Sequence, residues 1–213
     1  AGVAALVLAL VGSTVSATPF AAAVVDYSPG PGQWVSDPRF NDPTLALGRP
    51  YGISPTEPDN TSVVTLGDGG SITLAFDHNV EDDPANPGGY DLVVFSNALF
   101  IGGNPAYRWQ EPAFVEVSQN ASDWHLLLPN KLPSELASAD TGPSSTVLRN
   151  YAEYTPTLAL PQDRTPEEFY TVPDRQSVVG DAASLSVDPV SGGGDAFDIA
   201  TAVRQTCPGV PLR

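Results

Sequence analysis

Proline and glycine recur so often along this chain that long regular elements have little room to form. The 213 residues include 22 Pro and 19 Gly. Proline interrupts helices and central strands because it has no amide hydrogen to donate, and glycine supplies the conformations of tight turns. The runs between them are short and rich in β-branched and aromatic residues, which is typical of strands. We therefore predict an all-β fold, an antiparallel, jelly-roll-like β-sandwich with long loops. A hydrophobic content of 41% is enough to give it a buried core.

The chain divides into an export segment and one large domain. Residues 1–10 are almost wholly apolar and small residues follow at 13–17, which is the pattern of a signal-peptide core and its cleavage site. We expect cleavage after Ala17, Ala22 or Ala23, and assign residues 1–23 to a signal-peptide remnant; a mature N-terminal strand or a pilin-like helix is the alternative. Residues 24–213 form the sandwich domain. Within it, residues 129–173 are predicted to be a long insertion or excursion loop.

Alternating side chains predict two hairpins and one central strand. Residues 63–66 and 71–76 flank a glycine-rich turn and predict a hairpin with one buried face. Residues 113–118 and 124–128 flank a polar turn and predict a second hairpin. Residues 90–95 are nearly all apolar, which favours a strand that is covered on both sides.

The charge balance excludes some classes of partner. Nine Lys and Arg against 25 Asp and Glu give a formal net charge of -16. This excess repels phosphate backbones and anionic lipid headgroups, so we expect no nucleic-acid binding and no membrane insertion of the mature domain. The lone Cys207 allows no internal disulfide, so the fold depends on its own core.

An ordered set of segments points to a type of protein. They are residues 42–50, 64–76, 89–97, 111–118 with Trp124, and 192–200. Together they span most of residues 27–200 and resemble a family of exported bacterial cell-surface proteins whose members often carry sorting tails of the PEP-CTERM type. The resemblance implies a secreted or cell-surface location. Residues 115–124 show a looser similarity to discoidin-like, galactose-binding jelly rolls, which implies carbohydrate binding or adhesion, often with a structural Ca²⁺.

The residues that usually carry catalysis are sparse. His78 and His125 lie in separate contexts, no Gly-x-Ser-x-Gly sequence occurs, and Cys207 follows no pattern that would activate its thiol. Glu111 and Glu116 are candidates for a carboxylate pair of the glycosidase kind, with a solvated strand face as the alternative. We predict that the protein is not an enzyme.

Oxygen-rich loops predict a structural Ca²⁺ site. Residues 192–194 are three glycines that give a flexible backbone around an ion, and Asp195 and Asp198 follow them. The alternative is that these two carboxylates cap turns. Residues 81–84 are a solvated turn or a second, weaker cation site. The predicted ligands are Asp195, Asp198, Asp91, Asp37, Asn41 and Asp42.

Aromatic residues in turn-rich segments predict a ligand platform, because a flat ring stacks well on the face of a sugar. The alternative for Trp109 is that its ring closes one end of the sandwich core. Trp34 and Trp124 are predicted to be core residues. The predicted ligand-binding residues are Trp109, Tyr107, Tyr51 and Phe100.

These patterns leave two functions open. One is a secreted or cell-surface binding module for a polysaccharide or a surface protein, stiffened by Ca²⁺. The alternative is a structural or assembly protein of an extracellular matrix or filament, which associates with copies of itself.

Overall fold

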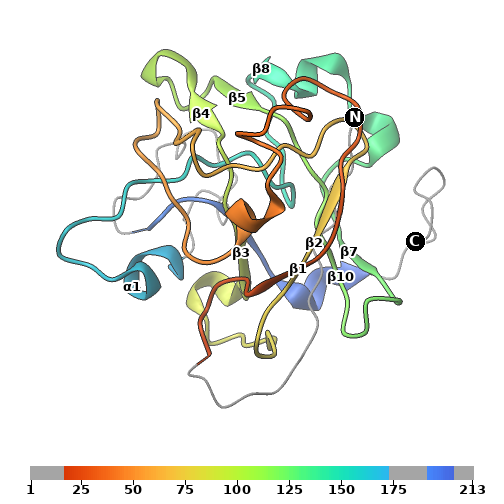
Figure 1. The fold of residues 1–213 in the computed structure, drawn as a ribbon, viewed down its shortest axis with the longest axis vertical. Helices are drawn as coiled ribbons and strands as arrows, with labels where there is room; N and C mark the ends of the chain where they lie inside the picture. The colour runs from red at the N-terminus through yellow and green to blue at the C-terminus, as the bar shows by residue number, and fades with distance from the viewer. Residues whose placement is uncertain (1–16, 173–190, 204–213) are drawn as a thin grey trace.

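The computed structural model describes residues 17–172 and 191–203, which form a mostly β structure with small antiparallel sheets and one short helix (Figure 1). Within these ranges no helix is long and apolar enough to pass through a lipid bilayer. Residues 1–16 and Cys207 lie outside them, as do residues 184–187, for which the sequence predicts one more short strand. The strands are β1 (Ala23–Ser28), β2 (Ser71–Ala75), β3 (Leu92–Val94), β4 (Leu99–Phe100), β5 (Arg108–Gln110), β6 (Glu116–Val117), β7 (His125–Leu127), β8 (Gly142–Ser144), β9 (Asp195–Phe197) and β10 (Ala202–Val203). The helical segments are α1 (Pro166–Tyr170) and the 3-10 turns η1 (Pro43–Ala46), η2 (Pro87–Gly89), η3 (Ile101–Gly103), η4 (Pro133–Glu135), η5 (Ser138–Asp140) and η7 (Ile199–Thr201).

The partner of β2 is the N-terminal strand β1, so the predicted hairpin between residues 63–66 and 71–76 is wrong. The two strands are antiparallel, with a bulge between Val24 and Asp26. The segment before β2 bonds to a different part of the chain, because the Gly30 N–H donates to the Leu66 carbonyl at 2.8 Å. All five residues of β2 are buried, so the strand is covered on both sides.

The second predicted hairpin is confirmed. β6 pairs antiparallel with β7, and β10 adds to the other edge of β7. The turn closes around Asn120, whose Oδ1 accepts from the Ser122 and Asp123 N–H groups at 2.9 and 2.8 Å. A short polar side chain that bonds to the backbone two and three residues ahead is a local turn signal, which explains why sequence reasoning found this hairpin.

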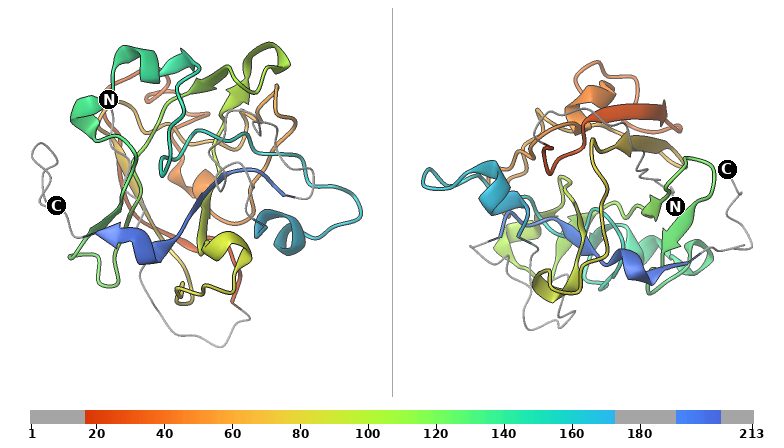
Figure 2. Two further views of the ribbon diagram at one scale, coloured as in Figure 1. Left: turned by 180° about the vertical axis from the view of Figure 1, so that it is seen from behind. Right: turned by 90° about the horizontal axis from the view of Figure 1, so that it is seen from below.

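The core lies on both sides of the chain that carries β6 and β7. Neighbouring residues there alternate between two apolar clusters, because successive side chains in a strand point to opposite faces. The first cluster contains Phe76, Leu92, Val115, Leu127, Ala152 and Phe197. The second contains Phe114, Leu126, Leu148, Tyr151 and Tyr154. Figure 2 shows β1 and β2 on one side of the molecule and the blue segment that carries β9 and β10 on the other.

A three-stranded sheet of order β4-β5-β8 takes its last strand from the predicted excursion. That excursion, as far as residue 172, also contains α1, which begins with a capping box: Thr165 accepts from the Glu168 N–H, and the Glu168 side chain accepts from the Thr165 N–H. The sequence Thr-Pro-Glu-Glu at 165–168 carries this signal, and our sequence analysis missed it.

Candidate functional site

β5 and its flanking residues present a row of exposed side chains on one face of the β4-β5-β8 sheet. Tyr107 is 40% exposed and Trp109 42%, whereas Arg108 and Gln110, which alternate with them, are 1% and 0% exposed. Glu111 continues the exposed series. Because side chains alternate along an extended chain, Tyr107, Trp109 and Glu111 share the outward face.

The inward side chain of Arg108 fixes this strand from below. Its Nη1 donates to the Tyr154 carbonyl at 2.8 Å and its Nη2 to the Pro105 carbonyl at 2.6 Å. The guanidinium also lies over the rings of Tyr154 and Phe100, 3.9 and 5.0 Å from their centroids. Hydrogen bonds from a charged, buried donor and its contacts with aromatic rings are strong, so they fix the backbone of the strand that carries the exposed row.

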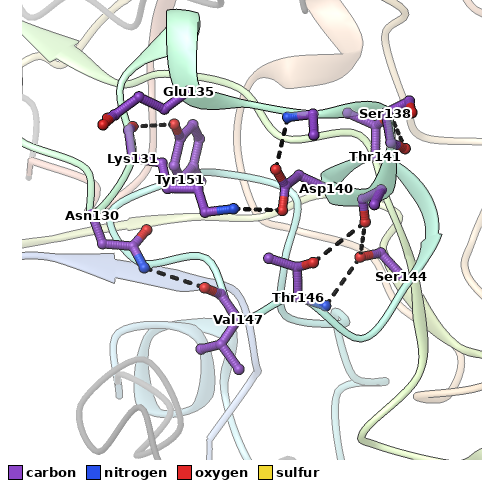
Figure 3. A network of polar contacts seen from close by, with 12 residues as sticks. Asn130, Lys131, Glu135, Ser138, Asp140, Thr141, Ser144, Thr146, Val147 and Tyr151 are labelled. Carbon is purple, nitrogen blue, oxygen red and sulfur yellow. Dashed lines mark hydrogen bonds and ion pairs between the residues drawn. The ribbon is translucent and has the colours of Figure 1, made fainter.

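Gln110 ties the same strand to a polar network in residues 130–151. Its Nε2 donates to the Asp140 carbonyl at 3.0 Å. The Asp140 carboxylate accepts from the Lys131 ammonium and from the Ala137 N–H, both at 2.8 Å, and Tyr151 donates to the Lys131 carbonyl (Figure 3). The bond from Lys131 lowers the pKa of the Asp140 carboxyl. This network supports β8, and through it the edge of the sheet next to Trp109.

Apolar neighbours flank Trp109 across the sheet. It is paired with Leu99 of β4 on one side and with the exposed Pro143 of β8 on the other. Side chains directly opposite each other in a sheet share a face and lie about 5 Å apart. Around Trp109 the outward surface is therefore apolar across three strands, and the row on β5 ends in the carboxylate of Glu111.

The other predicted ligand-binding residues lie differently. Phe100 is 3% exposed and sits inside the sheet against Arg108, so its prediction as a surface platform is wrong. Its side chain alternates inward in register with Arg108, which turn composition alone does not reveal. Tyr51 is 50% exposed, but the Arg49 guanidinium lies 4.0 Å from its ring centroid and covers one face.

The placement of Trp34 in the core is also wrong, since it is 51% exposed. Its backbone takes a positive φ of 70°, and its ring makes an edge contact with Phe40. Trp124 is partly buried.

A partly buried cluster of three aspartates lies where β3 and β9 meet. Asp82, Asp91 and Asp198 each offer a carboxylate oxygen, and these oxygens lie within 4.8 Å of one another. Because Leu92 pairs with Phe197 in adjacent antiparallel strands, the residues just outside that pair come together. Three carboxylate oxygens at this spacing could hold a metal ion.

Hydrogen bonds hold Asp91 at the centre of this cluster. Its Oδ2 accepts from the Ile199 N–H at 3.1 Å, and its Oδ1 accepts from the Asp83 N–H at 3.0 Å and from Asn86 Nδ2 at 3.1 Å. Asp198 accepts from the Ala200 N–H at 2.8 Å and so also caps η7, as the alternative interpretation expected.

The structure brings together only part of the predicted ligand set. Asp91 and Asp198 are joined by Asp82, which belongs to the segment predicted as a solvated turn or a second, weaker cation site. In the early loop, Asp37 pairs with Arg39 at 2.7 Å, which lowers its pKa to about 2, and Asp42 caps η1 by accepting from the Thr44 N–H at 2.9 Å. Asn41 lies in the same early loop, partly buried. None of these three is part of the aspartate cluster.

The three glycines at 192–194 are buried, so their assignment as a flexible wrap around an ion is wrong. A Cβ on Gly193 would lie 1.9 Å from the Pro156 carbonyl oxygen, and one on Gly194 would lie 2.8 Å from the Phe95 ring. Both residues have positive φ, which glycine adopts without strain. The segment is thus a close-packed crossing, not an open loop.

Asp195, the remaining predicted ligand, belongs to a buried carboxyl pair instead. It is 4% exposed, its Oδ2 accepts from the Tyr154 N–H at 2.9 Å, and burial raises its pKa to about 7. Glu153 has a positive φ of 68°, and its buried Oε1 has no hydrogen-bond partner in the described ranges. Burial, with smaller contributions from Glu111 and Asp195, raises the pKa of Glu153 to about 8. Sequence reasoning missed Glu153, because no local pattern marks a buried carboxyl group.

Comparison with known proteins adds no relative: no protein family, no curated protein and no solved structure matches the chain. The functional assignment therefore has to come from the two surface features described above, the exposed row on β5 and the aspartate cluster.

Proposed function

We propose that this chain is a non-enzymatic, exported binding module that holds a polysaccharide against Tyr107 and Trp109. The observation that carries this proposal is the pair of exposed aromatic rings on a strand whose opposite face is anchored by Arg108 and Gln110. Aromatic faces stack on the apolar faces of sugar rings, and a platform that is already rigid loses little entropy when the ligand binds.

Ca²⁺ acts in this proposal as a structural ion. Asp82, Asp91 and Asp198 provide three carboxylate oxygens, and backbone carbonyls or waters complete the coordination. An ion there fastens the loop before β3 to the chain that follows β9.

The proposal also includes the location of the protein at the bacterial surface and a jelly-roll-like architecture. The order of motifs and the net charge of -16 support an exported bacterial surface protein. Cleavage after Ala23 would remove the first residue of β1, whereas cleavage after Ala17 or Ala22 would leave the strand whole. Cleavage after Ala17 also keeps the hydrogen bond from the Ala22 N–H to the Ala75 carbonyl, which favours that site. We assign the small sheets to a jelly-roll-like sandwich, because one apolar cluster draws on β3, β7 and β9 and on Phe76 beyond β2.

An assembly protein of an extracellular matrix or filament is the second candidate. β1 is an edge strand of its sheet and Val25 on it is 51% exposed, which favours strand-to-strand pairing with another copy. Concentration-dependent polymers in analytical ultracentrifugation, together with no affinity for any glycan, would favour this candidate over the binding module.

A glycan array followed by calorimetry tests the binding module. We expect at least one polysaccharide to bind, and Trp109→Ala to weaken that binding by about tenfold or more, because removing a central aromatic anchor costs well over 1 kcal/mol. Trp34→Ala is the matched control, since Trp34 is 51% exposed against 42% for Trp109 but belongs to another segment. Equal losses in the two variants would contradict the proposal.

A further inference from the structure

The exposed row on β5 does not end in an aromatic residue. Glu111 follows Trp109 at the next outward position, so two ring faces and one carboxylate lie in line at intervals of about 7 Å. In the described ranges no hydrogen bond or ion pair engages the Glu111 carboxylate. An unengaged carboxylate at the end of an aromatic platform can pair with a positive group on a ligand.

The carboxyl groups that interact electrostatically with Glu111, directly or through a neighbour, are acidic as well. Glu111 acts electrostatically on Glu153, which in turn feels Asp195. The nearby Arg108 side chain leaves the strand on the opposite face, where backbone carbonyls and two rings engage its guanidinium. The outward face therefore receives little compensation from that cation.

The charge of the whole chain is negative, like the charge around Glu111. Its net charge is -16, and several basic residues are already occupied: Arg39 by Asp37, Lys131 by Asp140 and Arg49 by the Tyr51 ring. A strongly acidic surface attracts cationic polymers and repels polymers of uronic acids or sulfated sugars.

We propose that the polysaccharide held by Tyr107 and Trp109 carries free amino groups, so that its sugar rings stack on the aromatic residues while an ammonium group pairs with the Glu111 carboxylate. This inference rests on the proposed function and narrows its ligand class. An ammonium group next to an aromatic face also gains a cation–π contribution, which a neutral or acidic sugar does not.

The test compares three oligosaccharides of equal length at one constant pH of about 6. They are a glucosamine oligomer, its fully N-acetylated counterpart and an oligomer of a uronic acid, each measured by calorimetry with Ca²⁺ held constant. We expect the glucosamine oligomer to bind most tightly and to weaken as salt is added, because salt screens exposed charges.

Glu111→Gln isolates the charge without changing the shape of the side chain. It should weaken binding of the glucosamine oligomer by about two- to fivefold, which corresponds to an exposed ion pair, and leave the N-acetylated oligomer unchanged. Glu167→Gln on α1 is the matched control, since it removes one exposed carboxylate elsewhere and should change neither affinity. Trp109→Ala should weaken both oligomers.

Each other outcome overturns the inference in a distinguishable way. Equal affinities for the amino and acetylated forms, both lost in Trp109→Ala, would keep the platform and remove the role of charge. Tighter binding of the uronic acid oligomer would show that the face prefers an anionic ligand to a cationic one. If Glu111→Gln and Glu167→Gln lose affinity equally, the effect belongs to net charge alone. If none of the three oligomers binds although another polysaccharide binds on the glycan array, this inference is overturned and the proposed function is kept; if no glycan binds at all, both are overturned.

Discussion

At the scale of single residues, the exposed aromatic face of β5 depends on side chains that lie on the opposite face of the strand. Arg108 and Gln110 point away from the surface, and their bonds to the carbonyls of Tyr154 and Asp140 hold β5 in place. A buried guanidinium remains there only because carbonyls and ring faces replace its water shell. The exposed pair Tyr107 and Trp109 owes its fixed geometry to these hidden contacts.

The buried carboxyl group of Glu153 makes stability depend on pH. Its pKa rises from 4.5 to about 8 in the folded protein, and that of Asp195 rises from 3.8 to about 7. A group whose pKa is raised by folding stabilises the fold fully below its unfolded pKa, and this contribution disappears as the pH rises through the folded value. We therefore expect the free energy of unfolding to fall between about pH 5 and pH 8.

Glu153→Gln should remove the part of this dependence that Glu153 contributes, because the amide keeps the shape and cannot ionise; the part that belongs to Asp195 should remain. Urea unfolding of the wild type and the variant across this pH range measures the effect, and the variant should be relatively more stable at the alkaline end. Glu167→Gln, an exposed change, should follow the wild type. A difference between wild type and Glu153→Gln that stays constant with pH would refute the linkage.

At the scale of elements, the crossing at residues 192–194 determines how β9 reaches β3. Gly193 has a φ of 78° and lies against the Pro156 carbonyl, so it meets both a conformational and a steric demand. From there the chain enters β9, whose pairing with β3 places Asp198 beside Asp91. The aspartate cluster thus depends on glycines that are not ligands.

Gly193→Ala should destabilise the fold by about 3 kcal/mol or more, because the added carbon collides with backbone and the residue is held at positive φ. Gly69→Ala is the matched control: its φ is 69°, but nothing lies within 4 Å of the added carbon. It should cost only about 1 kcal/mol of conformational strain. Thermal unfolding of both variants checks this, and similar losses would contradict the close packing at residue 193.

Ca²⁺ should raise the melting temperature of the wild type relative to EDTA, because an ion that binds only the folded state stabilises it by mass action. Asp82→Asn should lose most of this shift, since it removes one of three charged ligands without breaking the bonds of Asp91. Glu81→Gln, the exposed neighbour, should keep it. Identical shifts in Asp82→Asn and the wild type would place the ion elsewhere.

The elements also show what the sequence can predict. The β6–β7 hairpin follows from alternation and a local Asn turn, and both signals lie within a dozen residues. The pairing of β1 with β2 and of β3 with β9 joins strands that are far apart in the chain, and no local pattern reports such partners. Asp91 and Asp198 were predicted as ligands of one ion. Asp82 was not added to them, because its segment was interpreted as a solvated turn or a second, weaker cation site, and Asp195 was not recognised as a core residue.

At the scale of the whole molecule, composition predicted the class of structure and left the arrangement open. The abundance of Pro and Gly predicted short strands, and over residues 17–172 and 191–203 the structure has small antiparallel sheets with one short helix. The exposed aromatic face was predicted in part: Trp109 and Tyr107 are exposed, while Phe100 is buried. The face on which a side chain lies depends on register, which composition does not determine.

The most direct test of the proposed function follows the indole N–H signals of the three tryptophans in a ¹⁵N spectrum during titration with a glucosamine oligomer or its N-acetylated counterpart. For an oligomer that binds, we predict a saturable shift of the Trp109 signal, assigned with Trp109→Phe, while Trp34 and Trp124 stay in place. A saturable shift at Trp34 or Trp124 with Trp109 unmoved, or no shift at any indole with either sugar, would contradict a saccharide platform on β5.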